Sequence, residues 1–198
     1  MNLSNNAVVL LAAGNSSRMG SPKQLLEYRH GPLIRHAAEV AIASGCARVI
    51  VVLGANAAEI RPALAGLPVD IVENPRWQEG MGASINAGIR AAEARGLGGA
   101  ILTLGDQPLI TPEILRNLIL EHQCTGQPIV ASQYARTVGV PVYFAKEYFP
   151  HLLALAPEQG CKGVILKHRE DARQINCPEA EADLDTPEDY AQLALSPS

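Results

Sequence analysis

The chain has 198 residues, 47% hydrophobic and 18% charged, which suffices for one domain with a substantial core and is too short for two full domains. The 16 Lys and Arg residues against 20 Asp and Glu give a net charge of −4, so no basic field exists to bind nucleic acid nonspecifically. Residues 7–13 and 49–53, the longest apolar runs, are far shorter than the roughly 18 residues of a membrane span, and the N-terminus lacks the features of a secretory signal. We therefore expect a single cytoplasmic domain over residues 1–198, with no membrane or nucleic-acid partner.

Short β-rich runs alternate with segments of helical periodicity, which predicts parallel βαβ units. Residues 7–11 are continuously apolar, as in a strand that is buried on both faces. Pro32 is a favourable first helical residue, and apolar residues follow at helical spacing up to Gly45. In chain order, the first half is expected to contain strand 7–11, a helix from Pro32 to Gly45, strand 49–53, a short helix 57–64, strand 69–72 and a helix 83–95 closed by Gly96.

The second half begins with strand 100–104, which ends abruptly in Gly105-Asp106-Gln107-Pro108. Thr111-Pro112-Glu113 combines an N-cap, a proline at the first helical position and an acid in the first turn, and so predicts a helix start. Gly139 and Pro141 predict an edge or bulged strand, so the sheet is expected to be mixed at that end. The remaining predicted elements are strands 128–132 and 138–144, helices within 146–155 and 162–168, and a helix that begins at Pro187.

A glycine-containing loop follows the first strand, where an α/β sheet places its ligand crevice. It reads Leu11-Ala12-Ala13-Gly14-Asn15-Ser16-Ser17-Arg18-Met19-Gly20-Ser21-Pro22-Lys23. Its glycines let backbone N–H groups approach an anion, Arg18 offers a planar fork and Lys23 a mobile point charge, which together favour phosphate binding. The spacing matches neither a Walker A loop nor a dinucleotide fingerprint, and an ordinary solvated loop of the same composition remains the alternative.

Acidic residues follow two further predicted extended segments. Asp106 should emerge at the carboxyl edge of the sheet, where it could bind a divalent cation or form an Asx-turn before Pro108. Asp183 and Asp185 lie two apart and could face one site, although Asp185 could also cap the helix at Pro187. Two carboxylates with an Arg and a Lys would together form a metal-assisted nucleotide site, since Mg²⁺ needs few protein ligands beside phosphate oxygens.

Other candidate residues carry weaker signals. Residues 80–84, Gly-Met-Gly-Ala-Ser, could contact a base or a ribose, or simply begin a helix. The five histidines and the serines form no hydrolytic triad pattern. The four cysteines have no C-x-x-C spacing and are predicted to be free thiols.

Three motifs in order resemble the small nucleotidyltransferases that attach a nucleoside monophosphate to the molybdenum cofactor, and in particular the cytidylyltransferase branch. They are residues 11–23, Gly105-Asp106-Gln107-Pro108, and the Asp183-Leu184-Asp185 segment that runs to Asp189. The resemblance spans essentially the whole chain. Two residues depart from the family pattern: Gly82, where the family often has serine, would loosen a polar contact near the nucleotide sugar, and Gln159, where an acid is common, removes a charge from a loop expected to face the acceptor.

The resemblance implies an α/β fold: a Rossmann-like three-layer architecture with a mostly parallel, partly mixed central sheet, of the nucleotide-diphospho-sugar transferase type. It implies catalytic roles for Arg18, Lys23 and Asp106, and a magnesium ion on Asp106 and Asp185, with Asp183 as a further candidate. The residues implied in nucleotide binding are Leu11, Ala12, Ala13, Gly14, Ser16, Ser17, Arg18, Lys23 and Ser84. Ala13, where guanylyltransferases usually have glycine, favours CTP over GTP.

The activity implied is transfer of CMP from CTP to the terminal phosphate of the molybdenum–molybdopterin cofactor, with release of pyrophosphate and with Mg²⁺ as the cofactor. A recipient molybdenum enzyme is a possible partner. The alternatives are a guanylyltransferase or a sugar-phosphate nucleotidyltransferase of the same fold, and a noncatalytic nucleotide- or cofactor-binding chaperone.

Overall fold

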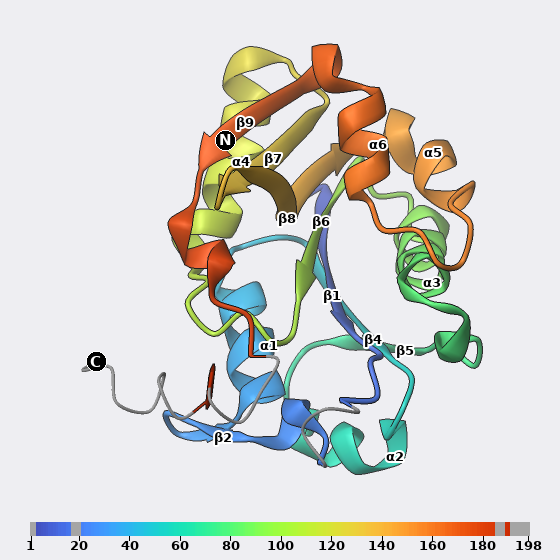
Figure 1. Ribbon diagram of the computed structural model, residues 1–198, viewed down its shortest axis with the longest axis vertical. Coiled ribbons are helices and arrows are strands. Elements are labelled where there is room, and N and C mark those ends of the chain that lie inside the picture. The colour runs from blue at the N-terminus through green and yellow to red at the C-terminus, as the bar shows by residue number, and fades with distance from the viewer. Residues whose placement is uncertain (1–2, 17–20, 185–188, 191–198) are drawn as a thin grey trace.

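A sheet with the strand order β5-β4-β1-β6-β8-β7-β9 runs through the centre of the computed structural model, which describes residues 3–16, 21–184 and 189–190 (Figure 1). Strands β5, β4, β1 and β6 are parallel, β8 is antiparallel to both of its neighbours, and β9 is parallel to β7. The strands are β1 (Asn6–Ala12), β4 (Arg48–Leu53), β5 (Asp70–Glu73), β6 (Gly99–Leu104), β7 (Ile129–Tyr134), β8 (Thr137–Ala145) and β9 (Ala172–Asn176). The expected three-layer α/β fold, with a central sheet that is mostly parallel and partly mixed, is confirmed.

Helices cover both faces of the sheet (Figure 1). On one face lie α1 (Leu33–Ala43) and α4 (Pro112–Thr125), and on the other α3 (Met81–Ala94), α5 (Phe149–Leu153) and α6 (Lys162–Lys167). The short α2 (Ala57–Ile60) follows β4. Six 3-10 helices complete the described secondary structure, together with a small hairpin: η1 (Lys23–Leu25), η2 (Arg61–Leu64), η3 (Trp77–Glu79), η4 (Lys146–Tyr148), η5 (Arg169–Asp171), η6 (Pro178–Glu181), β2 (Glu27–Tyr28) and β3 (Gly31–Pro32).

Strand β1 is buried along its whole length and divides the core into two layers. Val9 and Leu11 pack among the residues of α3, whereas Val8 and Leu10 pack among those of α1 and α4. Alternate side chains of a strand point to opposite faces, so a continuously apolar run is what a strand covered by helices on both sides requires.

The predicted Thr111 cap and the two glycine helix ends are confirmed, whereas Pro32, predicted as the first helical residue, has extended backbone and precedes α1 as its N-cap. Thr111 caps α4, where its side chain accepts a hydrogen bond from the Ile114 N–H at 3.4 Å. Gly45 and Gly96 follow α1 and α3 with φ angles of +84° and +69°, a left-handed conformation that glycine adopts without strain. Helix α3 begins at Met81, two residues earlier than predicted.

The structure corrects the prediction for the strand at 138–144. Its bulge alternative is confirmed, because the register against β7 shifts between Ala131 and Ser132. Its edge alternative is wrong, because β8 lies between β6 and β7. The shift accommodates Pro141, which has no N–H to donate, and the Ser132 Oγ donates to the Pro141 carbonyl at 2.6 Å.

Three further differences have simple physical reasons. The helix expected at 57–64 changes to 3-10 geometry after Ile60, where Pro62 cannot donate an α-helical hydrogen bond. Strand β9 was not predicted, since its sequence Ala-Arg-Gln-Ile-Asn has little apolar character, as suits an edge strand. The β2–β3 hairpin is too short to leave a periodic pattern. None of the helices in the described part of the chain is long and apolar enough to cross a membrane.

Candidate functional site

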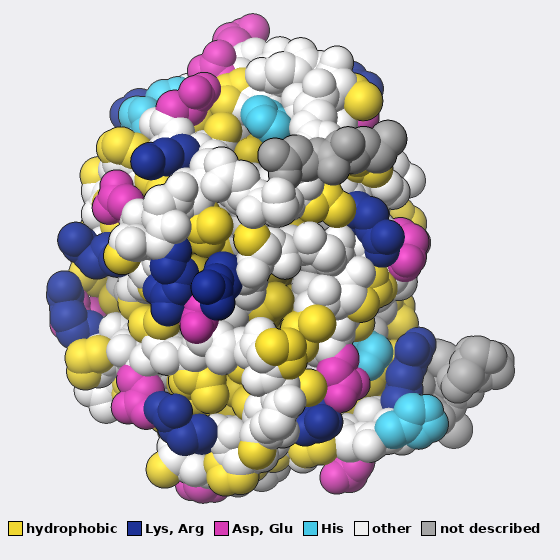
Figure 2. Space-filling view, turned by 180° about the vertical axis from the view of Figure 1, so that it is seen from behind, with side chains coloured by type: hydrophobic (Ala, Val, Ile, Leu, Met, Phe, Trp, Pro, Cys, Tyr) yellow, Lys and Arg dark blue, Asp and Glu magenta, His cyan; other side chains and the backbone are white. Residues whose placement is uncertain are grey.

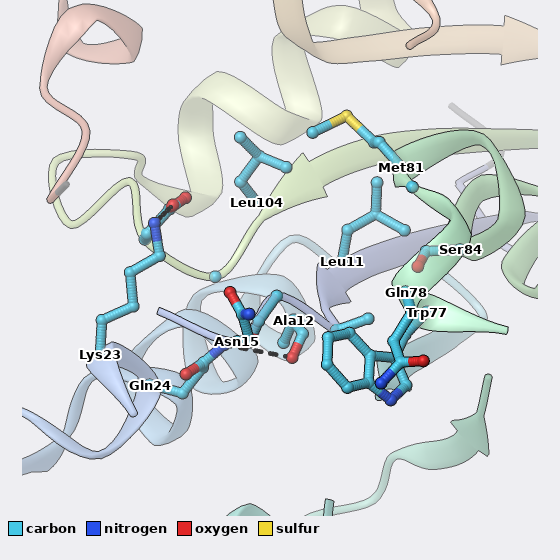
Figure 3. A pocket seen from close by; sticks show the side chains of 15 residues that line it. Leu11, Ala12, Asn15, Lys23, Gln24, Trp77, Gln78, Met81, Ser84 and Leu104 are labelled. Carbon is cyan, nitrogen blue, oxygen red and sulfur yellow. Dashed lines mark hydrogen bonds and ion pairs between the residues drawn. The ribbon is translucent and has the colours of Figure 1, made fainter. Parts of the chain in front are cut away.

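The topology places a crevice at the carboxyl ends of β1 and β6. The chain runs from β1 outward to β4 and β5 on one side and then returns to β6 on the other side of β1. Such a switch point leaves a crevice in which α/β sheets bind ligands. A pocket of about 380 Å³ occupies this place (Figure 3). Its lining residues come from β1 and the loop after it, η1, η3, the start of α3, and β6 and the loop after it: Leu11, Ala12, Ala13, Gly14, Asn15, Lys23, Gln24, Trp77, Gln78, Gly80, Met81, Ser84, Leu104, Gly105 and Asp106.

Most of the residues predicted for the site meet in this pocket. Those that line it are Leu11, Ala12, Ala13, Gly14, Lys23, Ser84 and Asp106. Ser16 does not line it. Ser17, Arg18 and Asp185 lie outside the described residues, so their predicted roles stay predictions.

The loop after β1 is supported from within by Gln24, which is only 3% exposed. Its Nε2 donates to the carbonyls of Ala12 at 3.3 Å and Gly14 at 3.0 Å (Figure 3). The Ser16 Oγ donates to the Gln24 Oε1 at 3.2 Å and accepts the Lys23 N–H at 3.0 Å. Ser16 therefore shapes the loop. Sequence reasoning missed Gln24, because nothing in the local pattern distinguishes a buried glutamine from an exposed one.

Lys23 and Asp106 form an ion pair on one side of the pocket (Figure 3). Their side chains are 16% and 15% exposed. The pair joins Nζ to Oδ2, and the structure therefore favours an ionic role for this carboxylate over the Asx-turn alternative. Pro108 also has no N–H with which to close such a turn.

The second carboxylate oxygen of Asp106, Oδ1, is buried and has no hydrogen-bond partner among the described residues. A buried acceptor left unpaired is costly, and a divalent cation is one group that would satisfy it. The described residues contain no group of three or more His, Cys, Asp or Glu side chains that could hold a metal ion. A cation at Asp106 would thus depend on phosphate oxygens, water and residues outside the described part of the chain, which is how Mg²⁺ is commonly bound.

Hydrogen bonds join the segment from Cys177 to Leu184, here called the C-terminal strap, to the loop that contains Asp106. The Leu184 N–H donates to the Asp106 carbonyl at 3.1 Å. The buried Gln107 donates from Nε2 to the Ala180 carbonyl at 2.8 Å. The strap therefore brings residue 184, the neighbour of both Asp183 and Asp185, next to the Asp106 loop.

Trp77, Gln78 and Ser84 lie on the other side of the pocket, with Met81 above Leu11 (Figure 3). Ser84 is 5% exposed and accepts a hydrogen bond from the buried Asn74. A Cβ at Gly54 would stand 2.5 Å from the Trp77 Cβ and 2.8 Å from the Ala13 carbonyl, so glycine there permits close packing behind the pocket. Sequence reasoning missed Asn74 and Trp77, which come from a turn that no motif marks.

The start of α3 also contacts the loop between α5 and α6. The Gly82 N–H donates to the Pro157 carbonyl at 2.8 Å. A Cβ at Gly82 would lie 2.2 Å from the Ala156 carbonyl oxygen. The helix start is therefore both an ordinary N-terminus and a docking point for residues 156–159, next to the pocket residues Gly80 and Met81.

The cysteines and histidines are not part of the pocket lining. The four cysteines are free thiols, as predicted. Burial raises the pKa of the Cys161 thiol to about 12, which keeps it protonated and poorly nucleophilic.

A model of the MobA-like NTP transferase domain matches residues 8–172. The chain belongs to this family. Molybdenum cofactor cytidylyltransferase of Escherichia coli K12 is 25% identical over 183 residues, which cover 92% of each chain. Nicotine blue oxidoreductase of Paenarthrobacter nicotinovorans is 40% identical over 116 residues, but the match covers only 58% of this chain and 56% of that protein. The family assignment confirms the resemblance seen in the three motifs.

Solved structures are also similar to this chain over nearly its whole length. The crystal structure of Rv0371c from Mycobacterium tuberculosis H37Rv is 32% identical with a TM-score of 0.80, and the match covers 99% of this chain and 100% of that one. A complex of the same protein with manganese is 31% identical with a TM-score of 0.76, covering 98% and 100%.

Proposed function

We propose that this chain transfers CMP from CTP to the terminal phosphate of the molybdenum–molybdopterin cofactor and releases pyrophosphate. The observation that carries the proposal is the pocket at the β1–β6 switch point, which pairs a charged side with a less polar one. Family membership and the full-length similarity to a molybdenum cofactor cytidylyltransferase support the choice of reaction.

The two sides of the pocket suit the two ends of a nucleoside triphosphate. Lys23, with Arg18 from the undescribed part of the loop, would hold the phosphates, since both are cationic. The backbone of Ala12 to Gly14 and the Ser84 side would hold the base and ribose, where backbone groups and a hydroxyl can supply hydrogen bonds.

In the proposed reaction, an oxygen of the acceptor phosphate attacks the α-phosphorus of CTP in line. A new P–O bond forms as the bond from the α-phosphorus to the bridging oxygen breaks, and pyrophosphate leaves with that electron pair. A phosphate monoester is already anionic, so the protein needs no general base. Its residues act by alignment and by stabilising the charge that develops on the leaving group.

Asp106 fits a magnesium site because its Oδ1 is buried and unpaired within the described residues. Asp106 and Asp185 would hold the ion, and Asp183 is a further candidate. Bound there, Mg²⁺ would supply charge neutralisation on the phosphate oxygens. Lys23, now paired with Asp106, would turn toward the phosphates when a cation takes over that carboxylate.

The test is magnesium-dependent release of pyrophosphate in the presence of molybdenum-loaded molybdopterin, measured separately with CTP, GTP and ATP, and with chelator as the metal-free control. Release with CTP alone supports the proposal. Release with GTP alone assigns the chain to the guanylyl alternative, and release that requires a sugar phosphate instead of molybdopterin assigns it to that acceptor class.

If no pyrophosphate is released with any acceptor and the nucleotide binds without metal, the binding-chaperone alternative would be favoured. The similarity to nicotine blue oxidoreductase adds one more arm to the assay. The protein is incubated with nicotine blue and a chemical or nucleotide reductant, and protein-dependent reduction of nicotine blue without pyrophosphate release from any nucleotide would overturn the transferase proposal in favour of an oxidoreductase.

A further inference from the structure

The Ser84 hydroxyl is held by a neighbour whose own orientation is fixed. Asn74 follows β5 and is 5% exposed, as is Ser84. Its Nδ2 lies 3.0 Å from the Ser84 Oγ, and its Oδ1 lies 3.0 Å from the backbone nitrogen of Arg76. An amide could in principle be turned about, but here it cannot, since a backbone N–H can only donate. Oδ1 must therefore face Arg76, and Nδ2 must face Ser84.

The orientation of Asn74 determines in which direction the Ser84 hydroxyl can donate its hydrogen. The Ser84 Oγ accepts the Asn74 N–H, so its own hydrogen must point elsewhere. No acceptor for that hydrogen is found among the described residues, whereas Ser84 lines the pocket. A buried hydroxyl seeks a partner for its hydrogen, and the ligand is the group that can provide one.

The other buried amide at the pocket does not compete for this role. Both hydrogens of the Gln24 amide are directed at the carbonyls of Ala12 and Gly14, and its oxygen accepts from Ser16. Gln24 is occupied in holding the loop. Among the described residues that line the pocket, Ser84 is thus the buried polar side chain whose hydrogen-bond donor remains available to a ligand.

We propose that Asn74 is a positioning residue that presents the Ser84 hydroxyl to the pocket as a hydrogen-bond donor, so that the ligand atom facing Ser84 is a hydrogen-bond acceptor. The inference rests on the proposed function only in taking the ligand to be a nucleotide. That atom is either a ribose oxygen or an acceptor of the base, its carbonyl oxygen or its ring nitrogen, and each of these can accept the hydrogen bond.

The test measures binding of CTP by calorimetry without any acceptor, so that it does not depend on cytidylyl transfer. Ser84→Ala should weaken binding about tenfold, the effect of losing one hydrogen bond to a buried group. Asn74→Asp keeps the shape but places a carboxylate oxygen where Nδ2 stood. That oxygen would accept the serine hydrogen and turn it away from the ligand, so binding should weaken by a similar factor.

A double-mutant cycle separates this effect from a change in charge or fold. In the Ser84→Ala background, Asn74→Asp should weaken binding no further, because no hydroxyl remains to be oriented. An equal loss in both backgrounds would overturn the proposal, and so would unchanged binding by the folded Ser84→Ala variant. Should Asn74→Asp fail to fold, Asn74→Ala tests the same coupling without added charge, with a smaller loss expected that also vanishes in the Ser84→Ala background.

Two controls complete the design. Ser132→Ala removes another buried serine hydroxyl, in β7 and away from the pocket lining, and should leave CTP binding unchanged. Binding of 2′-deoxy-CTP distinguishes the sources of the acceptor. If the acceptor is the ribose 2′-oxygen, Ser84→Ala should cost nothing further with the deoxynucleotide, whereas an acceptor on the base or another ribose oxygen predicts the same tenfold loss with both.

If CTP does not bind the wild-type protein, the same series is run with GTP and ATP. Failure of all three nucleotides to bind would overturn both the inference and the proposed function. Binding without any transfer would contradict the proposed function alone.

Discussion

Asp106 combines two features that are unusual in a carboxylate that is merely structural. One of its oxygens pairs with Lys23, and the other is buried without a partner in the described part of the chain. A structural ion pair would use both oxygens or expose the spare one, because leaving a buried acceptor unpaired costs about 1–3 kcal/mol. The arrangement is instead what is expected of a carboxylate that binds a cation through its second oxygen.

We expect Asp106→Asn to lower the rate of nucleotidyl transfer by on the order of 10²-fold or more, since it removes the charge that would hold the metal. The pocket should still form, because asparagine has the same shape. The measurement is single-turnover kinetics, with circular dichroism as the check on folding. A folded variant with a near-normal rate would show that Asp106 is not the metal ligand.

At the scale of the elements, two contacts connect separate parts of the chain to the pocket. The first is the docking of the loop 156–159 on the start of α3, which leaves no space for a Cβ at Gly82. The second is the C-terminal strap, which Gln107 and the Asp106 carbonyl hold against the end of β6. Both contacts join segments that are far apart in sequence next to residues that line the pocket.

The substitution Gly82→Ala should destabilise the protein by about 1–3 kcal/mol, because the added methyl group meets backbone that cannot rotate away. The free energy of unfolding in urea measures this. Gly163→Ala is the matched control, since that helical glycine has nothing within 4 Å of an added Cβ. It should be neutral or stabilising by up to about 1 kcal/mol. Equal effects of the two substitutions would refute the close-packing argument.

Gln107→Leu conserves volume but removes the hydrogen bond to Ala180. Hydrogen exchange of the amides in the C-terminal strap should become faster than in the wild type, since the strap loses one of the hydrogen bonds described above between it and the Asp106 loop. The overall loss of stability should be about 1–3 kcal/mol, because the Ala180 carbonyl is left unpaired. Exchange rates in the strap that match the wild type would mean that packing alone holds it.

At the scale of the whole molecule, stability should depend on pH through His36 on α1. Burial lowers the pKa of His36 below its usual 6.5, and the positive charge of Arg29 lowers it further. The unfolded chain then takes up a proton at a higher pH than the folded chain. Stability is therefore retained above about pH 6.5 and falls as the pH drops through the pKa of the folded state.

Urea unfolding from about pH 7.5 to about pH 5 checks this expectation. The difference in stability between wild type and His36→Gln should shrink, or reverse in favour of the variant, as the pH falls. A constant difference across this range would show that His36 does not contribute to the pH dependence.

The strands and helices that the sequence predicted well are those with two-sided burial or clear end signals, such as β1 and the Thr111 cap of α4. Those it missed have neither. Strand β9 is a polar edge that pairs with β7, a partner more than 30 residues away in sequence. The same limit applies to the site. The motif residues Gly14, Lys23 and Asp106 were recognisable from the sequence, whereas the buried residues outside the motifs were not.

The sequence by itself therefore determined the βαβ alternation, the two-faced core around β1 and the family, because periodicity and short motifs are local properties of a chain. Only the tertiary structure decided the place of β8 inside the sheet, the bracing of the loop by Gln24 and the Asn74–Ser84 pair. These depend on which groups meet across many residues of chain. A buried Asn or Gln cannot be distinguished from an exposed one in the sequence, and only the packed structure shows which of its hydrogen bonds are already made.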